Sequence, residues 1–545
     1  MKNYSFLILL TLFSSPLNAD GFDEWSKIAQ GRLDSPAIDG ITEQWTGPDG
    51  KQIKLAVRQP VINSATEIII YPVVGDARPV FELAIAKARA EKINKIVVTH
   101  GVYNFLSTDT TGQHMLFSKA KDLLVEGNGA SLRFFKNMNG IVIRQSQRVR
   151  LQNMTLSFAL KSSSWGTIDG SGQLVVDAAV TAADKIYQIA QVDSDGVFIP
   201  VGIRLIMPPG KEAPTYVGNQ SYSYSGFSKI TPGTRFFVMH QWYGGSAIKI
   251  DGDRDALMTE DITFSGINIH STPGMAVAVT GLKRGFAFVN SMLVPNPGSI
   301  NVGGPLWDGI HVSSGGGDIL IKGNQFVGLG DDAINISNPI NPVVSVVDNK
   351  LLLSSSSRFI DQSDELAYFN TDGGYLGKGV VLSVIDRGAG KFEFEMDSIA
   401  AGAFVVRDIN LIASRYAMVD NVFDNLNVHG VLAQIPNGLI SGNTFSRLGK
   451  NAIRLLSSIG PWLEGVGAFN VAVRGNDIAS GGIDSGFGVN WAAITAYGQK
   501  SDGNLSDTLF NDNIEVSGNT ITGVAQNCVS ISNTKNAIIN NNICN

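Results

Sequence analysis

The segment Asp308-Gly309-Ile310-His311-Val312 and the segment Asp331-Asp332-Ala333-Ile334-Asn335-Ile336 decide the fold. Each is an acidic turn that leads into a strand of alternating apolar residues. When Gly309 is aligned with Ala333, Asp308 falls in register with Asp332, a step of 24 residues. In a β-solenoid with coils of about that length, the two carboxylates would stack at roughly the 4.8 Å spacing of neighbouring strands. The two segments therefore predict a wound sheet with three carboxylates on one surface patch.

The crowding of these carboxylates predicts unusual protonation. Like charges at that distance cannot all ionise freely, so at least one carboxyl pKa should rise. A protonated carboxyl beside an ionised one is what acid/base hydrolysis of an acetal requires. Asp331 and Asp332 alone would suit ordinary turn chemistry, because Asp bonds its own backbone in tight bends. The presence of Asp308 in the same column favours a functional site.

The composition is typical of a long β-repeat protein. The chain has 545 residues, of which 60 are glycine and only 17% are charged. An elongated repeat fold reaches this length around one continuous core. The net charge is −6 and no basic stripe is visible, which argues against a nucleic-acid partner.

The N-terminus has the layout of a secretory signal, with a basic start, a short apolar run at 6–13 and the small residue Ala19 at the expected cut. The apolar run is too short to span a membrane. We therefore expect a bacterial protein that is periplasmic or secreted, with no membrane partner. Cys528 and Cys544 are the only cysteines. In an oxidising compartment they would form a disulfide across the last coil, but two buried thiols fit the sequence as well.

Residues 77–88 predict a short amphipathic helix, and residues 95–99 predict a strand. This order resembles the N-terminal cap of secreted right-handed β-helix enzymes, and such a cap would cover open strand edges. Beyond it the pattern apolar-x-apolar-x-x-Asn-x-apolar recurs, which predicts a structural ladder of Asn side chains at one turn of the solenoid. The pattern occurs, with slack of about a residue, at Asn268, Asn290, Asn324, Asn421, Asn443, Asn476, Asn519 and Asn541.

Two long stretches interrupt this rhythm while keeping strand-like runs, and each predicts a small inserted antiparallel β module. The second stretch begins a few residues after Asp332, so we expect it to form a wall over the carboxylates. The predicted organisation is a signal peptide at 1–19, a cap and first coils at 20–161, an inserted module at 162–235, catalytic coils at 236–338, a second module at 339–407 and C-terminal coils at 408–545.

Several of these features together resemble glycoside hydrolase family 110, whose members are exo-acting α-1,3-galactosidases on a right-handed β-helix. The resemblance extends over most of the mature chain and is most specific from about Ile262 to Gly475. It implies that Asp331 is the general acid and that Asp308 and Asp332 hold and deprotonate the attacking water, with inversion at the anomeric carbon. Family 28 polygalacturonases share the three-aspartate layout more distantly. The motifs that carry the resemblance are Asp308–His311, Gly330–Asn335, His270–Met275 and Pro461–Glu464, with the two interruptions.

The same register brings further side chains toward the predicted site. Arg454 falls in the column of His311 and Asn335; Arg454 is a candidate for sugar hydroxyls or a carboxylate, whereas His311 suits a ligand and a structural role equally. Glu464 matches an acidic position of the family, which implies contact with a sugar hydroxyl. Each of two tryptophans suits either a platform for a sugar face or packing against a loop. The predicted substrate-binding residues are therefore His311, Asn335, Arg454, Trp307, Trp462 and Glu464.

His429-Gly430 departs from the family 110 pattern and is similar to the His-Gly of polygalacturonases. The matching Arg-x-Lys signature is absent and the mature chain is acidic, so a galacturonate site has poor charge support. The three aspartates lack a nearby set of histidines with metal-ligand spacing, so we expect neither a catalytic metal nor another cofactor. The sequence allows a Ca²⁺ ion among the carboxylates but does not require one.

We therefore expect an all-β protein, a right-handed parallel β-helix with an N-terminal cap helix and two inserted antiparallel β modules. The expected function is that of a secreted, inverting exo-glycoside hydrolase that releases terminal α-1,3-linked galactose from a glycan. The alternatives are a polysaccharide lyase or polygalacturonase-like hydrolase on the same scaffold, and a non-enzymatic carbohydrate-binding solenoid. The sequence leaves homo-oligomerisation open, since solenoid flanks can pair into dimers or trimers but nothing in the sequence decides between them.

Overall fold

The computed structural model describes residues 19–31, 40–63, 65–177, 179–181, 183–200, 202–252, 259–296, 301–338, 340–354, 359–460, 462–465, 467–479, 492–523 and 527–545. The predicted signal segment lies outside these ranges except for Ala19, and so does Pro461 of the family motif. Within the described ranges no helix is both long and apolar enough to cross a lipid bilayer.

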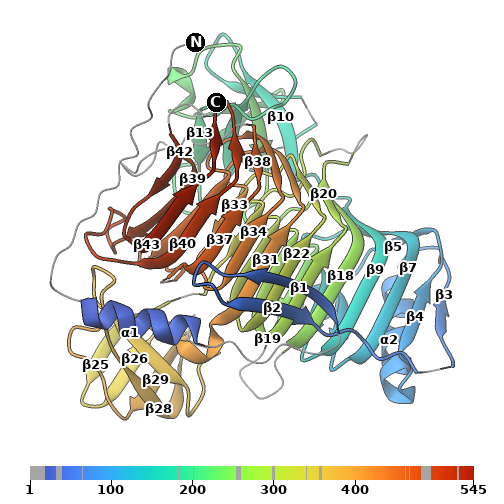
Figure 1. The fold of residues 1–545 in the computed structure, drawn as a ribbon. Coiled ribbons are helices and arrows are strands. Elements are labelled where there is room, and N and C mark those ends of the chain that lie inside the picture. The colour runs from blue at the N-terminus through green and yellow to red at the C-terminus, as the bar shows by residue number, and fades with distance from the viewer. Residues whose placement is uncertain are drawn as a thin grey trace.

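The chain winds into a right-handed parallel β-helix whose coils pair strand by strand (Figure 1). One coil shows the plan. From β21 (Ile310–Gly315) the chain passes through β22 (Gly317–Lys322) and β23 (Gln325–Val327) to β24 (Ile334–Ile336), which returns to pair in parallel with β21. Repetition of this path builds three parallel sheets. The first sheet contains β22, the second contains β23 and the third contains β24. The predicted fold class is confirmed.

Four long, bent strands belong to more than one of the three sheets, because different parts of each strand pair in different sheets. These four are β7 (Lys121–Phe134), β9 (Gln147–Phe158), β18 (Thr259–His270) and β19 (Val277–Val289). The first sheet also holds β3 (Ile68–Ile70), β4 (Lys95–Val98), β22, β31 (Ala413–Val419), β34 (Gly438–Ser441), β37 (Phe469–Arg474), β40 (Asn511–Ser517) and β43 (Thr534–Asn540). The second holds β5 (Val102–Phe105), β20 (Met292–Val294), β23, β32 (Val422–Leu426), β35 (Thr444–Leu448), β38 (Asp477–Ile478), β41 (Thr520–Ile521) and β44 (Ile543–Cys544). The third holds β6 (Gln113–Ser118), β8 (Asn139–Arg144), β17 (Ile248–Asp251), β21, β24, β33 (Val431–Ala433), β36 (Ile453–Ser458), β39 (Ala492–Gln499) and β42 (Asn527–Ile531).

Alternation along the strands divides the third sheet into an inner and an outer face. Ile310 pairs with Ile334, and both are fully buried in the core of the solenoid. The predicted step of 24 residues is therefore correct. Because successive side chains of a strand point to opposite faces, His311 and its partner Asn335 lie on the outer face.

A ladder of buried Asn side chains runs along the turn between the first and second sheets. In each step one Asn donates its backbone N–H and its side-chain amide to the Oδ1 of the Asn one coil on, at 2.8–3.0 Å. Two predicted members are not in it: Ser291 takes the place predicted for Asn290 and donates its backbone N–H to Asn324, and Asn268 is a strand residue that pairs with Met292. The last rung is Asn542, one residue beyond the predicted Asn541. The ladder comprises Asn324, Asn421, Asn443, Asn476, Asn519 and Asn542.

Helix α2 (Arg78–Glu91) closes the N-terminal end of the solenoid. Its apolar face, with Phe81 and Ile85 buried, packs into the same core as the coil interior. The predicted cap helix is thus confirmed. At the other end, Cys528 and Cys544 form a disulfide with a Cα–Cα distance of 6.2 Å, so the structure favours the first of the two cysteine interpretations.

Two antiparallel modules interrupt the coils, as predicted. The first is a seven-stranded sheet inserted between β9 and β17, in the turn from the second to the third sheet. The second is a closed barrel inserted between β24 and β31, in the turn from the third to the first sheet. The first module comprises β10 (Ser163–Ile168), β11 (Leu174–Val176), β12 (Gln188–Val192), β13 (Arg204–Ile206), β14 (Thr215–Gly218), β15 (Ser221–Ser223) and β16 (Arg235–Met239), and the barrel comprises β25 (Asn341–Val347), β26 (Lys350–Leu353), β27 (Glu365–Phe369), β28 (Tyr375–Gly388), β29 (Lys391–Met396) and β30 (Val405–Asp408).

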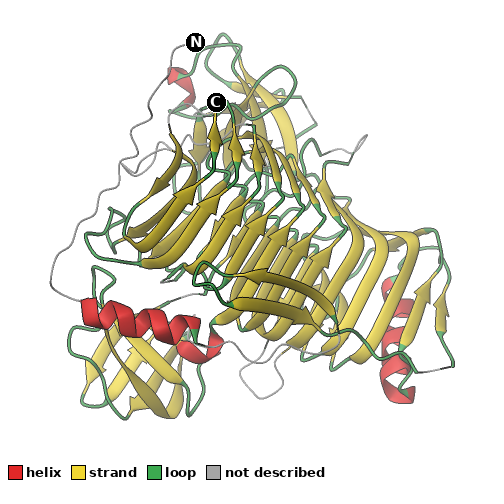
Figure 2. Ribbon diagram, viewed as in Figure 1, coloured by secondary structure: helices red, strands yellow, loops and turns green. Residues whose placement is uncertain are grey.

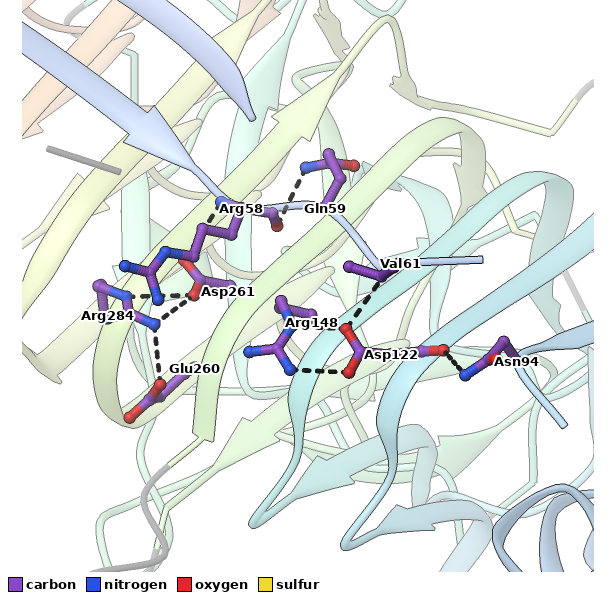
Figure 3. A network of polar contacts seen from close by, with 9 residues as sticks. All are labelled: Arg58, Gln59, Val61, Asn94, Asp122, Arg148, Glu260, Asp261 and Arg284. Carbon is purple, nitrogen blue, oxygen red and sulfur yellow. Dashed lines mark hydrogen bonds and ion pairs between the residues drawn. The ribbon is translucent and has the colours of Figure 1, made fainter. Parts of the chain in front are cut away.

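Helix α1 (Ala19–Gln30) lies over the barrel (Figure 2), where Trp25 packs on Phe369 and Tyr375, while Phe22 packs on Phe469 of the solenoid strand β37. A hairpin of β1 (Ile41–Thr46) and β2 (Gln52–Val57) covers apolar side chains on the outer face of the first sheet. The segment after the hairpin continues along that face, where the backbone N–H of Arg58 reaches Asp261 and that of Val61 reaches Asp122, each at 3.3 Å (Figure 3). The outer face of the third sheet holds the site described next.

Candidate active site

The three predicted carboxylates come together in the turns that lead from the second sheet into the third. Asp308 precedes β21, and Asp331 and Asp332 precede β24 one coil later. One oxygen of each residue lies within 4.8 Å of an oxygen of the others. The stacking predicted from the 24-residue step therefore occurs.

Asp308 and His311 form a close pair, with His311 Nδ1 2.5 Å from Asp308 Oδ2. Burial raises the pKa of Asp308 to about 6, and the hydrogen bond and charge of His311 only partly oppose that rise. Burial alone would lower the pKa of His311, but the hydrogen bond and charge of Asp308 raise it to about 9. Between these values the pair consists of a carboxylate and an imidazolium.

Asp332 is the carboxyl that most readily keeps a proton. Burial and the charges of Asp331 and Asp308 raise its pKa well above the usual range, although the backbone N–H of His429 donates to its Oδ1 at 3.1 Å. His429 lies one coil on, since β24 pairs with β33, and this alignment follows the predicted register. The site thus combines an Asp308 carboxyl paired with His311 and an Asp332 carboxyl whose pKa burial and the neighbouring carboxylates raise well above its usual range.

Asp331 faces the first inserted module. Arg204 of β13 lies 3.5 Å from its Oδ1, and Gln188 of β12 donates to the backbone oxygen of Gly330 at 3.4 Å. We expected the second module to form this wall. The first module does so instead, because it is inserted in the same turn as the carboxylates, whereas the barrel departs from the far end of β24.

A polar floor continues along the outer face of the third sheet from the carboxylates. Glu464 accepts hydrogen bonds from Asn335 at 3.3 Å and from Gln434 at 2.9 Å. Buried polar groups are almost always paired, yet several atoms here have no protein partner among the described residues. These are Asn335 Oδ1, Ser337 Oγ, both amide atoms of Asn338 and Gln434 Oε1. The outer face beside the carboxylates is therefore strongly polar.

Arg454 completes the predicted column but lies farther along it. Its guanidinium donates to His429 Nε2 at 3.0 Å and to the hydroxyl of Tyr497. Burial and the charge of Arg454 lower the pKa of His429 well below the usual range, so this imidazole is neutral. Because Nε2 accepts, the proton of that ring is on Nδ1, which lacks a hydrogen-bond partner within the described ranges. Arg454 therefore sets the tautomer of His429.

The two tryptophans, for which a sugar platform and packing against a loop were both predicted, differ in exposure. Trp307 is only 2% exposed, and its ring is stacked under Tyr243 with centroids 4.0 Å apart. The alternative prediction, packing against a loop, is therefore correct for Trp307. Trp462 is 75% exposed, and no described contact ties it to the carboxylates. Tyr243 and Arg204 lie at the site without having been predicted, and only the aromatic and glycine-rich run Trp242–Gly245 could have signalled the first of them.

The carboxylates are also the group of residues best suited to hold a cation. Their oxygens are ligands that Ca²⁺ and Mg²⁺ accept, but Ca²⁺ takes about six to eight of them. Each carboxylate already has a neighbour in the protein, namely His311, Arg204 or the backbone N–H of His429.

The fold and the site define a parallel β-helix protein with a cluster of three carboxylates in the turns that lead into one sheet. Two relatives are both named α-1,3-galactosidase A, from two strains of Bacteroides fragilis. The first is 22% identical over 451 residues and the second 23% identical over 438 residues; each alignment covers 74% of this chain and 71% of the relative. No family model matches the chain.

Two solved structures superpose on most of the chain at low similarity. The A-module of the Azotobacter vinelandii mannuronan C-5 epimerase AlgE4 has a TM-score of 0.42 and 11% identity, and covers 87% of this chain and 95% of its own. A polygalacturonase from Erwinia carotovora has a TM-score of 0.34 and 10% identity, and the match covers 89% of this chain and 96% of the polygalacturonase. The sequence relatives agree with the resemblance that the motifs predicted. The chain is a β-helix protein similar to the α-1,3-galactosidases of glycoside hydrolase family 110.

Proposed function

We propose that this protein is a glycoside hydrolase that releases terminal α-1,3-linked galactose from oligosaccharides or polysaccharides. One observation carries the proposal: three carboxylates lie within 4.8 Å of one another, two of them buried with raised pKa values, beside the polar side chains of Asn335, Gln434 and Glu464. Acid/base cleavage of a glycosidic bond needs a protonated and an ionised carboxyl side by side. The linkage and the sugar are supported by the names of the two relatives.

In this proposal Asp308 is the base. The imidazolium of His311 favours its ionised form above pH 6, so that Asp308 can take a proton from a water held between it and Asp332. The resemblance to the family gives Asp331 the role of general acid toward the glycosidic oxygen. The raised pKa of Asp332 makes that residue the competing candidate for the same role.

The stereochemical outcome can be tested separately. Inversion follows from the resemblance, but inverting enzymes usually separate acid and base by about 6.5–9.5 Å, whereas retaining enzymes use about 5–5.5 Å. Proton NMR of the first product released, read before the anomers equilibrate, distinguishes the two.

The decisive experiment compares Asp308→Asn, Asp331→Asn and Asp332→Asn on an α-1,3-linked galactobiose and on α-galactosyl fluoride. Fluoride leaves without a proton, so the variant of the general acid should keep its activity on the fluoride and lose it on the disaccharide. The variant of the base should lose both. Asp477→Asn, which changes an exposed aspartate at the start of β38, is the matched control and should keep both.

Other outcomes would replace the proposal. Release of an unsaturated uronide, seen by its ultraviolet absorbance, would indicate a lyase. Binding of galactosides without any turnover, unchanged in Asp331→Asn, would indicate a carbohydrate-binding solenoid. We also propose export to the periplasm or the medium, on the basis of the N-terminal segment, and cell fractionation with an antibody against the mature chain tests it.

A further inference from the structure

Tyr243 stands beside the carboxylates with part of its ring open to solvent. It lies in the loop between β16 and β17, and 45% of the residue is exposed. Its other face rests on Trp307, with ring planes 17° apart, and Trp307 directly precedes Asp308 in the chain. Burial and the negative charges of Asp331 and Asp308 raise the pKa of its hydroxyl, which agrees with a position at the rim of the site.

The loop that carries Tyr243 is held in place by neighbouring coils. The backbone N–H of Gly244 donates to Pro273 at 3.1 Å, and that of Gly245 donates to the Oδ1 of Asn137 at 2.9 Å. Tyr243 itself has a φ of +39°, a backbone conformation that a bulky residue rarely adopts without a reason. The ring is therefore a rigid surface whose orientation is maintained at some cost.

The position of Tyr243 relative to the polar floor indicates which sugar it meets. In the third sheet the strands follow the order β17, β19, β21, β24 and β33. Tyr243 precedes β17, Gln434 follows β33, and the carboxylates lie between them. A terminal galactose over the polar floor would then have its leaving group on the side of Tyr243.

We propose that Tyr243, supported by Trp307, is the stacking platform for the sugar on the leaving-group side of the scissile bond. The inference rests on the proposed hydrolase function and extends it to the part of the substrate that is released. One face of a pyranose presents C–H groups, which pack on an aromatic ring, while the ring edges keep their hydroxyls in water. An open ring with a buried aromatic behind it offers such a face without losing side-chain freedom on binding.

The test compares Tyr243→Ala and Tyr243→Phe on the two substrates used above. α-Galactosyl fluoride has no sugar on the leaving-group side, so Tyr243→Ala should leave its kcat/KM within about twofold of wild type. On the α-1,3-linked galactobiose the same variant should lose about tenfold, and Tyr243→Phe should keep most of the activity. Tyr71→Ala, which removes a tyrosine that is 63% exposed, is the control and should change neither value.

An equal loss on both substrates, or no loss on either, would overturn the platform. Failure of the hydrolase proposal would look different, because the wild-type protein would then cleave neither substrate. In that case titration calorimetry with the galactobiose still decides the matter: weaker binding to Tyr243→Ala supports the platform, and equal binding overturns it. Unchanged thermal unfolding of the variants shows that the fold is intact.

Discussion

The pair of Asp308 and His311 yields the sharpest prediction, which concerns the substitution His311→Asn. The amide of Asn can still donate a hydrogen bond to Asp308, but it carries no charge. In the wild-type protein the pKa of Asp308 is about 6, with His311 Nδ1 only 2.5 Å away. The variant therefore removes a nearby positive charge while leaving a donor in place.

The size of the effect follows from that geometry. An opposite charge within about 4–6 Å lowers the pKa of a carboxyl by about 1–3 units. Loss of the imidazolium should raise the pKa of Asp308 from about 6 to between about 7 and 9. At pH 7 the ionised fraction would fall by about two- to a hundredfold. Because Asp308 acts as the base in its ionised form, kcat/KM should fall by the same factor and recover as the pH rises.

The assay is the pH profile of kcat/KM on α-galactosyl fluoride between pH 4.5 and 10, a range chosen around the two pKa values of about 6 and about 9. This substrate needs no general acid, so the acidic limb reports only groups that must lose a proton, as a macroscopic value for the coupled carboxylates. His270→Asn is the matched control, since His270 bonds a backbone oxygen at 3.2 Å and no carboxylate. A uniform loss of activity with an unmoved acidic limb would refute the reasoning.

Two further predictions concern stability. Asp332 has a raised pKa in the folded state, so its contribution to folding stability is favourable at low pH and declines as the pH rises from about 4 through the folded value. Asp332→Asn should therefore raise the thermal midpoint at pH 8 and leave it nearly unchanged at pH 4. An equal shift at both pH values would contradict this explanation. Asn443→Ala should lower the free energy of unfolding by about 4 kcal/mol, because it leaves two buried donors of Asn421 without an acceptor. Urea unfolding measures that loss. Asn504→Ala, at an exposed position, is the control and should change the free energy of unfolding by less than about 0.5 kcal/mol. Similar urea midpoints for the two variants would show that the ladder adds little stability.

What the sequence could predict follows from periodicity. A strand has a side-chain period of two, so any alignment that keeps the apolar residues inside also decides which residue stands above which. That is why the register of Ile310 with Ile334, and hence the stack of Asp308 on Asp332, could be derived from a 24-residue step alone. The Asn ladder was predicted less accurately, because Ser291 can occupy a rung that the pattern assigned to its neighbour Asn290.

By itself, then, the sequence determined the solenoid and the carboxylate stack, since both follow from a pattern that repeats from one coil to the next, and it determined the cap helix, whose apolar residues recur with the helical period. Only the tertiary structure decided what surrounds the stack. Arg204 reaches Asp331 across 127 residues, Asn335 reaches Glu464 across 129, and the ring of Tyr243 covers Trp307. No repeat relates these partners; their contacts depend on how an inserted module and two loops dock on the outer face, and docking is a matter of shape that a one-dimensional pattern does not contain.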